Sequence, residues 1–188
     1  MIISLEGLLG AGKTTTAKLV AKRMGIRYIH ERSEDVPFLD AFYSNVERYK
    51  LETELCFVLI HYHQYRDLSV DTVLDYSPSK DLIFANLNLS GPDLDLFTAV
   101  YSHTLGKLSA PDITVFLDLD QDLLLQRIEA RGRPYEQGFD PDYLGRLAEM
   151  YKKNFANLGK KVGRVSVSAS QGPDDVAEEV LSVIDKLE

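Results

Sequence analysis

The chain has 188 residues and a formal net charge of −8, with 45% hydrophobic and 27% charged residues. This composition is typical of one folded globular domain, and no apolar run approaches the roughly 20 residues of a membrane span. The acidic balance argues against binding nucleic acid through a broad basic face, so we expect neither a nucleic-acid nor a membrane partner. The single Cys56 cannot form an internal disulfide and Met1 leads directly into an apolar run, which favours a cytoplasmic location.

The first predicted element is a strand over Ile2–Glu6, followed at once by the sequence GLLGAGKT at 7–14. This segment matches the phosphate-binding pattern G-x-x-x-x-G-K-[ST], and the residues after it predict a helix over Lys13–Met24. Glycines let backbone N–H groups wrap a phosphate, and the helix N-terminus adds partial positive charge. We expect the lysine to reach the β- and γ-phosphates and the next hydroxyl to bind Mg²⁺. The residues expected to hold a nucleoside triphosphate such as ATP are Gly7, Gly10, Ala11, Gly12, Lys13, Thr14 and Thr15.

Short apolar runs alternate with helical patterns along the rest of the chain, which predicts a parallel α/β sheet in one domain, 1–188. After the first strand, further strands are predicted at Arg27–His30, Thr72–Asp75, Ile113–Asp118 and Arg164–Ser168. Helices are predicted at Lys13–Met24, Val36–Tyr43, Val46–Leu68, Lys80–Leu87, Leu94–Leu108, Gln121–Ala130, Pro141–Leu158 and Asp174–Leu187. No internal repeat or linker divides the sequence.

Acidic residues follow three of the predicted strands. Ligands of open parallel sheets bind at the carboxyl ends of strands, and Glu31, Asp75 and the pair Asp118 and Asp120 stand at these ends. Beside a triphosphate, such carboxylates can serve as a base or as partners of the metal. We expect Thr14 to hold Mg²⁺ with Glu31 or Asp75, directly or through water. Helix capping is an equal alternative for Asp118 and Asp120, whereas for Glu31 a functional role is favoured.

Three arginines, Arg127, Arg131 and Arg133, surround the predicted end of a helix that Gly132 interrupts. The first two fall on one helical face. Phosphoryl transfer is catalysed mainly by positioning and by neutralising charge on the transferred oxygens, which arginine does well. A loop that closes over the phosphates would also exclude water. The alternative is a solvated basic helix end, favourable at the negative pole of the helix dipole; the phosphate loop in the same chain favours the catalytic interpretation.

Four regions resemble the deoxynucleoside kinase family, in the family's order. Residues 127–136 resemble its lid signature R-x-x-x-R-G-R-x-x-E, and 142–147 continue the similarity. Residues 36–49 resemble the stretch after the family's catalytic acid, and 83–85 match the end of its third-strand motif. The resemblance implies a P-loop three-layer α/β sandwich with strand order 2-3-1-4-5, an arginine-rich helical lid at about 127–138, and a homodimer. It implies transfer of a γ-phosphate from ATP or another nucleoside triphosphate to a deoxynucleoside 5′-hydroxyl, in nucleotide salvage.

The resemblance also implies roles for individual residues. Glu31 would be the general base for the 5′-hydroxyl, and Lys13 would act on the phosphates. Tyr43 and Glu136 would hold the sugar 3′-hydroxyl. The lid arginines would contact the phosphates and the donor, with Arg131 and Arg133 as the clamp and Arg127 near the nucleotide.

Departures from the family pattern bear on the substrate. Long family members carry Glu-Arg-Ser after strand three, whereas this chain has Asp75-Tyr76-Ser77, as in shorter bacterial-type members. We therefore expect Arg32 or the lid to compensate for the missing arginine. The base-reading glutamine falls at Glu54 and its neighbouring arginine at His61, and the paired acid falls at Lys80 or Asp81.

The residue at position 54 leads to a prediction about the base. An ionised Glu54 can only accept hydrogen bonds, whereas glutamine both donates and accepts. Guanine, with two adjacent N–H donors, would suit a carboxylate best, and the carbonyls of thymine would be repelled. Thymidine is therefore expected to be the poorest substrate, provided that burial does not protonate Glu54.

Two rival functions follow from the same motifs. A nucleoside monophosphate kinase of similar fold would need extra basic residues such as Arg32 and Arg66, but the usual Asp-Arg pair after strand three is absent from the sequence. A nucleotide-dependent sensor without kinase activity is the second rival. A GTPase would need an N-K-x-D motif, and this sequence has none.

Overall fold

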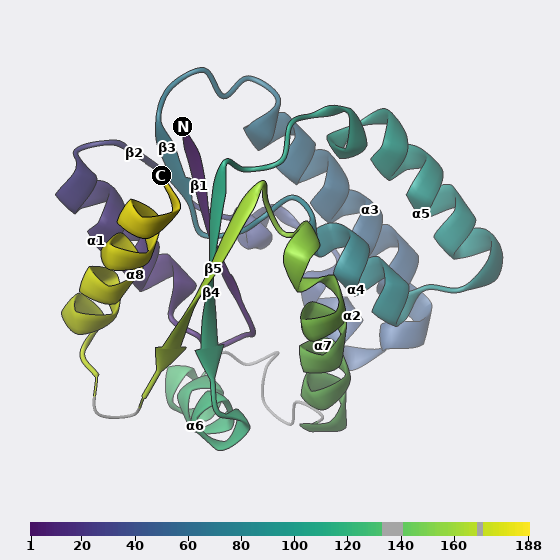
Figure 1. The fold of residues 1–188 in the computed structure, drawn as a ribbon. Coiled ribbons are helices and arrows are strands. Elements are labelled where there is room, and N and C mark those ends of the chain that lie inside the picture. The colour runs from purple at the N-terminus through teal and green to yellow at the C-terminus, as the bar shows by residue number, and fades with distance from the viewer. Residues whose placement is uncertain (133–140, 169–170) are drawn as a thin grey trace.

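A computed structural model describes residues 1–132, 141–168 and 171–188. Its centre is a five-stranded, fully parallel sheet with the order β2-β3-β1-β4-β5 (Figure 1). The strands are β1 (Ile2–Gly7), β2 (Arg27–Ile29), β3 (Thr72–Leu74), β4 (Ile113–Leu119) and β5 (Lys161–Val167). The predicted α/β class and the strand order 2-3-1-4-5 are confirmed.

Helices cover both faces of the sheet and one of its ends (Figure 1). On one face lie α1 (Lys13–Met24) and α8 (Pro173–Leu187); on the other lie α3 (Val46–Tyr65), α4 (Lys80–Asn88), α5 (Gly91–His103) and α7 (Pro141–Asn154). Next to α3 packs α2 (Leu39–Ser44), and α6 (Gln121–Arg131) lies at the end to which the arrows of β4 and β5 point. Short 3₁₀ turns occupy Ser33–Asp35 (η1), Leu105–Lys107 (η2) and Phe155–Asn157 (η4). The carboxyl ends of the strands therefore open between α1, α3, α4 and α6.

The core has two sides because strand side chains alternate between the faces of the sheet. Ile3 and Leu5 are fully buried, and they pack with Ala17 and Val20 of α1 and Val180 of α8. Each buried valine, leucine or isoleucine side chain stabilises the fold by about 1.5–3 kcal/mol. The opposite sheet face is covered by a second and a third apolar cluster, which include Val58, Leu74, Phe97, Phe116 and Leu147. Both faces of the sheet are therefore dry, as a parallel sheet requires.

Three elements start three residues from the predicted position. Three helices end earlier than predicted, at Tyr65, His103 and Asn154 instead of Leu68, Leu108 and Leu158, and other ends differ by at most one residue. The helix predicted from Val36 begins at Leu39, because Val36 precedes a proline and is extended, with φ −80° and ψ 106°. The helix predicted from Leu94 begins at Gly91, since Pro92 stands in its first turn, where no intrahelical N–H bond is lost. Strand β5 begins at Lys161, three residues before the predicted Arg164, as Lys161 pairs in register with Ile113.

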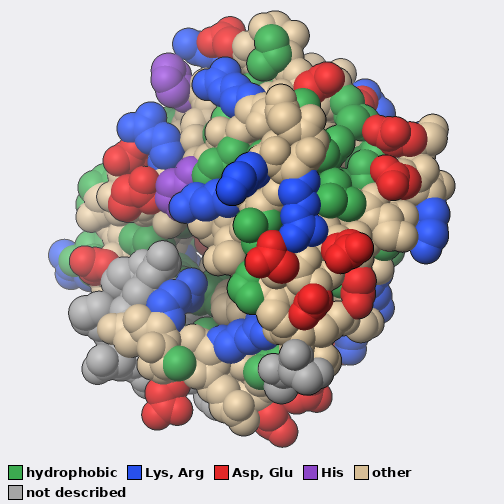
Figure 2. All heavy atoms as spheres, turned by 90° about the vertical axis from the view of Figure 1, so that its left-hand side faces the viewer, with side chains coloured by type: hydrophobic (Ala, Val, Ile, Leu, Met, Phe, Trp, Pro, Cys, Tyr) green, Lys and Arg blue, Asp and Glu red, His purple; other side chains and the backbone are tan. Residues whose placement is uncertain are grey.

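The outer surface of α1 and α8 carries intermingled basic and acidic side chains (Figure 2). One such pair joins the two helices, since Arg23 Nη2 lies 2.5 Å from a carboxylate oxygen of Asp174. Within the described ranges, no helix combines the length and apolarity needed to cross a membrane.

Candidate active site

The phosphate loop leaves the carboxyl end of β1 and enters α1. A Cβ on Gly7 would lie only 2.7 Å from the carbonyl oxygen of Leu117, so only glycine allows β1 and β4 to approach here. Gly12 directly precedes α1 with φ +89°, a conformation that glycine adopts without strain. The Lys13 ammonium donates to the Gly7 and Leu8 carbonyls at 2.8 and 3.1 Å. The loop is thus closed on itself around its own lysine, and burial lowers the pKa of Lys13.

A cavity of about 360 Å³ opens beside this loop. The sequence-predicted residues that line it are Gly7, Gly10, Ala11, Gly12, Lys13, Thr14, Thr15, Glu31, Tyr43, Glu54, Asp75, Arg127 and Arg131. The phosphate loop and the arginines of α6 share this cavity with residues of α2, α3 and α4. Two predicted site residues, Arg133 and Glu136, lie outside the described residues.

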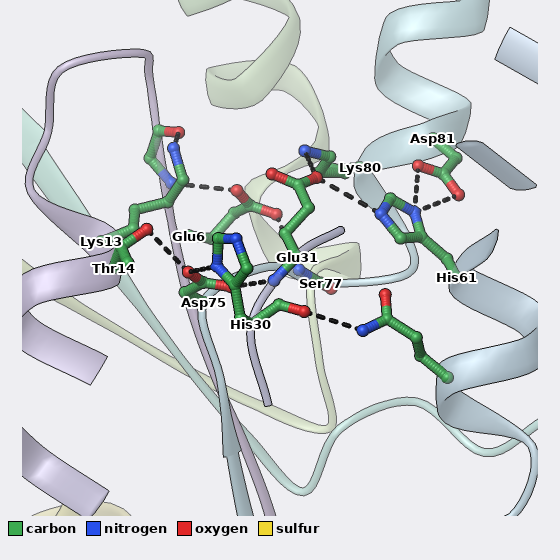
Figure 3. Close-up of polar contacts among 12 residues, drawn as sticks. Glu6, Lys13, Thr14, His30, Glu31, His61, Asp75, Ser77, Lys80 and Asp81 are labelled. Atoms are coloured by element: carbon green, nitrogen blue, oxygen red, sulfur yellow. Dashed lines mark hydrogen bonds and ion pairs between the residues drawn. The ribbon is translucent and has the colours of Figure 1, made fainter. Parts of the chain in front are cut away.

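Asp75, directly after β3, ties the phosphate loop to the second strand. It is buried (1% exposed) and accepts the Thr14 hydroxyl at 2.6 Å, the Glu31 backbone N–H at 2.6 Å and the Tyr28 hydroxyl at 2.8 Å. The Nδ1 of His30 lies 3.1 Å from the same carboxylate. Of the two acids considered as partners of Thr14, it is therefore Asp75 whose carboxylate contacts this hydroxyl (Figure 3).

Glu31 lies at the centre of a row of alternating charges (Figure 3). Its Oε1 accepts from the ammonium of Lys80 and lies 3.3 Å from Nε2 of His61. The other imidazole nitrogen of His61 lies 2.9 Å from both carboxylate oxygens of Asp81. Burial alone would raise the pKa of Glu31, but the charges of Lys80 and His61 outweigh burial and hold that pKa below its ordinary value. Glu31 is therefore ionised and faces the cavity.

His61 does not have the place expected for a residue that touches the base. It is fully buried, stacks on Tyr76 with ring centroids 4.3 Å apart, and is not among the described residues that line the cavity. Burial would lower the pKa of His61, but the carboxylates of Asp81 and Glu31 raise it to about 9. His61 is thus a cation between two acids behind the cavity wall.

A positive charge reaches Glu31 from Lys80, whereas Arg32 or the lid had been expected to compensate for the missing arginine. Arg32 instead pairs with Asp35 at the surface. The Lys80 ammonium reaches Glu31 from the start of α4, and it lies 5.6 and 5.5 Å from the ring centroids of Phe57 and Phe84. Sequence reasoning considered position 80 only as a place for an acid, since the spacing from Tyr76 does not reveal that α4 turns this lysine toward β2.

One buried acid, Glu6, was missed by the sequence analysis. Its side chain is fully buried at the end of β1 and accepts from the backbone N–H groups of Gly7 and Ser77, both at 3.1 Å, and from the Tyr151 hydroxyl at 3.2 Å. Burial raises the pKa of Glu6 despite the attraction of Lys80 and Lys13. A charged residue inside an otherwise apolar strand was the signal that could have revealed it.

Helices α3 and α4 line the cavity with Glu54 and Phe57, and with Asp81 and Phe84, respectively. Glu54 is 3% exposed and its Oε1 accepts from the side-chain amide of Asn88 at 2.7 Å. Burial raises the pKa of Glu54 to about 8. At neutral pH this side chain is therefore mostly a neutral acid that donates and accepts, so the premise of an acceptor-only carboxylate holds only in alkaline solution.

The acids after β4 are used structurally. Asp120 caps α6, because its carboxylate accepts the backbone N–H of Asp122 at 2.9 Å. Asp118 lies 3.3 Å from the guanidinium of Arg164 on β5. Asp120 is therefore a helix cap, as one of the two alternatives predicted, and Asp118 forms a surface ion pair.

Comparison with known proteins gives a family match over nearly the whole chain. The model of the family described as "Deoxynucleoside kinase" matches residues 3–187. A deoxyguanosine kinase of Bacillus subtilis is 34% identical over 177 residues, which cover 90% of this chain and 86% of that protein. A deoxyguanosine kinase of Lactobacillus acidophilus is 30% identical over 167 residues, covering 80% of this chain and 73% of the relative.

Solved structures share the fold. A structure of deoxyadenosine kinase from M. mycoides, with dCMP and dCDP bound, superposes with a TM-score of 0.82 and covers 100% of both chains. Only 21% of residues are identical, so this likeness concerns the fold. The five-stranded sheet and its helical layers are those of that kinase.

Proposed function

The chain belongs to the deoxynucleoside kinase family and phosphorylates deoxynucleosides with a nucleoside triphosphate as donor, and we propose that it transfers the γ-phosphate of ATP to the 5′-hydroxyl. The product is a deoxynucleoside monophosphate, as in nucleotide salvage. The observation that carries this proposal is the position of Glu31: an ionised carboxylate on the cavity that the phosphate loop also lines.

In this reaction Glu31 accepts the proton of the 5′-hydroxyl while that oxygen attacks the γ-phosphorus, the bond from this phosphorus to the β,γ-bridging oxygen breaks, and ADP leaves. Phosphoryl transfer is loose and needs orientation of the acceptor more than a strong base, so a carboxylate of low pKa suffices. Lys13 leaves its loop carbonyls to neutralise the β- and γ-phosphates. Arg127 and Arg131, which line the same cavity, balance charge on the donor. Arg133 and Glu136 remain predictions for the phosphates and the 3′-hydroxyl, the latter together with Tyr43.

Mg²⁺ fits the oxygen donors beside the loop. The Thr14 hydroxyl and the Asp75 carboxylate are 2.6 Å apart, and Mg²⁺ prefers oxygen ligands supplied by one or two side chains together with substrate phosphates. Phosphate oxygens of the donor and water molecules would complete the ligand set. Thr14 and Asp75 would hold the ion, which supplies positive charge against the phosphate oxygens.

A purine deoxynucleoside, with deoxyguanosine first, is the substrate that we propose. Two carboxyl groups, Glu54 and Asp81, line the cavity, and after burial the charge of Asp81 also raises the pKa of Glu54. Guanine presents adjacent N1–H and N2–H donors, which the Asp81 carboxylate and the carbonyl oxygen of a neutral Glu54 can accept. The deoxyguanosine kinases named above support the same choice. The flat base would lie between the aromatic walls of Phe57 and Phe84.

A nucleoside panel tests this proposal. Initial rates with Mg-ATP would be measured for deoxyguanosine, deoxyadenosine, deoxycytidine and thymidine, and the product phosphate would be located by ³¹P NMR. We expect a 5′-monoester and the highest kcat/KM for deoxyguanosine. Preference for a pyrimidine would overturn the base assignment, and turnover with deoxynucleoside monophosphates but not with nucleosides would favour the rival monophosphate kinase.

A homodimer is also proposed, through the neighbouring helices α3 and α5. Leu59 is 54% and Leu96 49% exposed, whereas the adjacent Val58 and Phe97 are fully buried. An exposed leucine on each of two packed helices supports an apolar contact with a second copy. Light scattering after size-exclusion chromatography should give twice the mass of 21.2 kDa, and Leu59→Glu should shift the protein to the monomer; a monomeric wild type would contradict the proposal.

A further inference from the structure

The carboxylate of Glu31 is held on one side only. Lys80, at the first position of α4, and His61, on α3, both approach Oε1. Within the described part of the chain, neither cation donates a hydrogen bond to Oε2. The result is a carboxylate whose two oxygens have different surroundings: Oε1 faces two cations, and the other oxygen points away from His61 (Figure 3), on a residue that lines the cavity.

The two cations are themselves held in place. His61 is fully buried, with both oxygens of Asp81 at 2.9 Å from Nδ1 and the ring of Tyr76 stacked on its face. Nε2 of His61 makes no hydrogen bond within the described residues, so the 3.3 Å approach to Glu31 is its principal polar contact. The Lys80 ammonium itself lies over the rings of Phe57 and Phe84, 5.6 and 5.5 Å from their centroids, and these cation–π contacts favour its position. Both positive groups are therefore pre-organised before any substrate arrives.

We propose that Lys80 and His61 form a two-cation clamp on Oε1 of Glu31, which leaves Oε2 to accept the proton of the attacking hydroxyl. This inference rests on the proposed role of Glu31 as the base. Tyr76, which stands where the family pattern led us to expect an arginine, carries no charge, and the clamp provides positive charge at the base from α3 and α4 instead. Lys80 and His61 are thus positioning residues that act through Glu31.

The clamp fixes the side-chain angles of Glu31, and positioning of this kind contributes to the chemical step more than to binding. Lys80→Met should therefore lower kcat by about 10²-fold while the KM for ATP changes by less than about 3-fold. Lys80→Arg keeps a cation at the same carboxylate and should recover most of the lost rate. His61→Gln should lower kcat by a smaller factor, because Lys80 remains.

The decisive experiment is a double-mutant cycle between Lys80 and Glu31. In a Glu31→Gln background, Lys80→Met should change kcat by less than about 3-fold, since the group through which Lys80 acts is gone. Lys50→Met is the matched control. The Lys50 side chain is also largely buried (17% exposed) and pairs with Glu47, but Lys50 does not line the cavity. The kcat of Lys50→Met should equal that of the wild type. Thermal unfolding and ATP titration of each variant identify any protein that fails to fold.

Each outcome has a definite meaning. If Lys80→Met lowers kcat by the same factor in the wild-type and the Glu31→Gln backgrounds, Lys80 acts directly on the phosphates and the clamp is wrong. If Lys80→Arg is as impaired as Lys80→Met, a cation at that place is not what matters, which also overturns the clamp. If Glu31→Gln alone leaves kcat unchanged, the proposed base itself fails, which is a separate result.

Discussion

Replacing Glu54 by glutamine should change how the stability of the protein depends on pH. The carboxyl group is 3% exposed, and burial raises its pKa from 4.5 to about 8. Between these two values the folded state keeps a proton that the unfolded chain releases, so the free energy of unfolding falls as pH rises. Glutamine has nearly the same shape, accepts the same bond from Asn88 and does not titrate.

The size of the effect follows from the two pKa values. Each pH unit between them is worth about 1.4 kcal/mol, so complete ionisation of Glu54 costs the folded state roughly 5 kcal/mol. Between pH 6 and pH 8 the wild type should lose about 2 kcal/mol more than Glu54→Gln. Other titrating groups are common to both proteins and cancel in the difference.

Urea unfolding at pH 6 and pH 8, followed by circular dichroism, measures this difference directly. The kinetic counterpart is base selectivity: the ratio of kcat/KM for thymidine to that for deoxyguanosine should fall from pH 6.5 to 9 in the wild type, as Glu54 ionises, and stay flat in Glu54→Gln. Identical loss of stability in the two proteins would refute the raised pKa. Glu54 would then be ionised at neutral pH and could only accept hydrogen bonds, as the sequence-based argument assumed.

Further substitutions probe other parts of the structure. Lys13→Met should lower kcat by about 10²–10³-fold, because charge on the transferred phosphate is no longer neutralised; steady-state kinetics with Mg-ATP checks this, and a loss below 10-fold would contradict it. Tyr151→Phe removes a donor to the buried Glu6 and should cost about 1–3 kcal/mol of stability in urea unfolding; an unchanged midpoint would argue against that bond. Gly163→Ala places a Cβ 2.3 Å from Val183 of α8 and should lower the free energy of unfolding by about 1–3 kcal/mol. The Cβ of Gly145→Ala in α7 meets no atom within 4 Å, so this change should raise the free energy of unfolding by about 0.5–1 kcal/mol. Equal effects of the two changes in urea unfolding would mean that β5 and α8 pack less tightly than described.

The fold could be predicted from the sequence because its signals are local. The glycine loop between Ile2–Glu6 and Lys13–Met24 requires a strand, a turn and a helix in that order, and apolar runs spaced by helices require a parallel sheet. The errors were at element ends. There, Pro37 and Pro92 acted in opposite directions: the first delayed a helix and the second began one.

The sequence identified candidate site residues only where a local pattern marks them. The phosphate loop, Glu31 and Asp75 could be singled out because each follows a strand. Lys80 and Glu6 were missed, since their roles depend on how α4 packs across the sheet and on which face of β1 is covered. His61 was singled out as well, but the orientation of its imidazole ring depends on Asp81, which lies twenty residues further on and on another helix. Tertiary contacts of this kind have no local sequence pattern.

The role of Glu31 as the base in phosphoryl transfer to a deoxynucleoside is central to the proposed mechanism. Single-turnover transfer from Mg-ATP to deoxyguanosine, compared between wild type and Glu31→Gln, tests it most directly, with ATP affinity measured in parallel by titration calorimetry. We predict a transfer about 10²–10⁴-fold slower in the variant, with ATP affinity unchanged. A transfer rate within about 3-fold of wild type would contradict the role of Glu31 as the base.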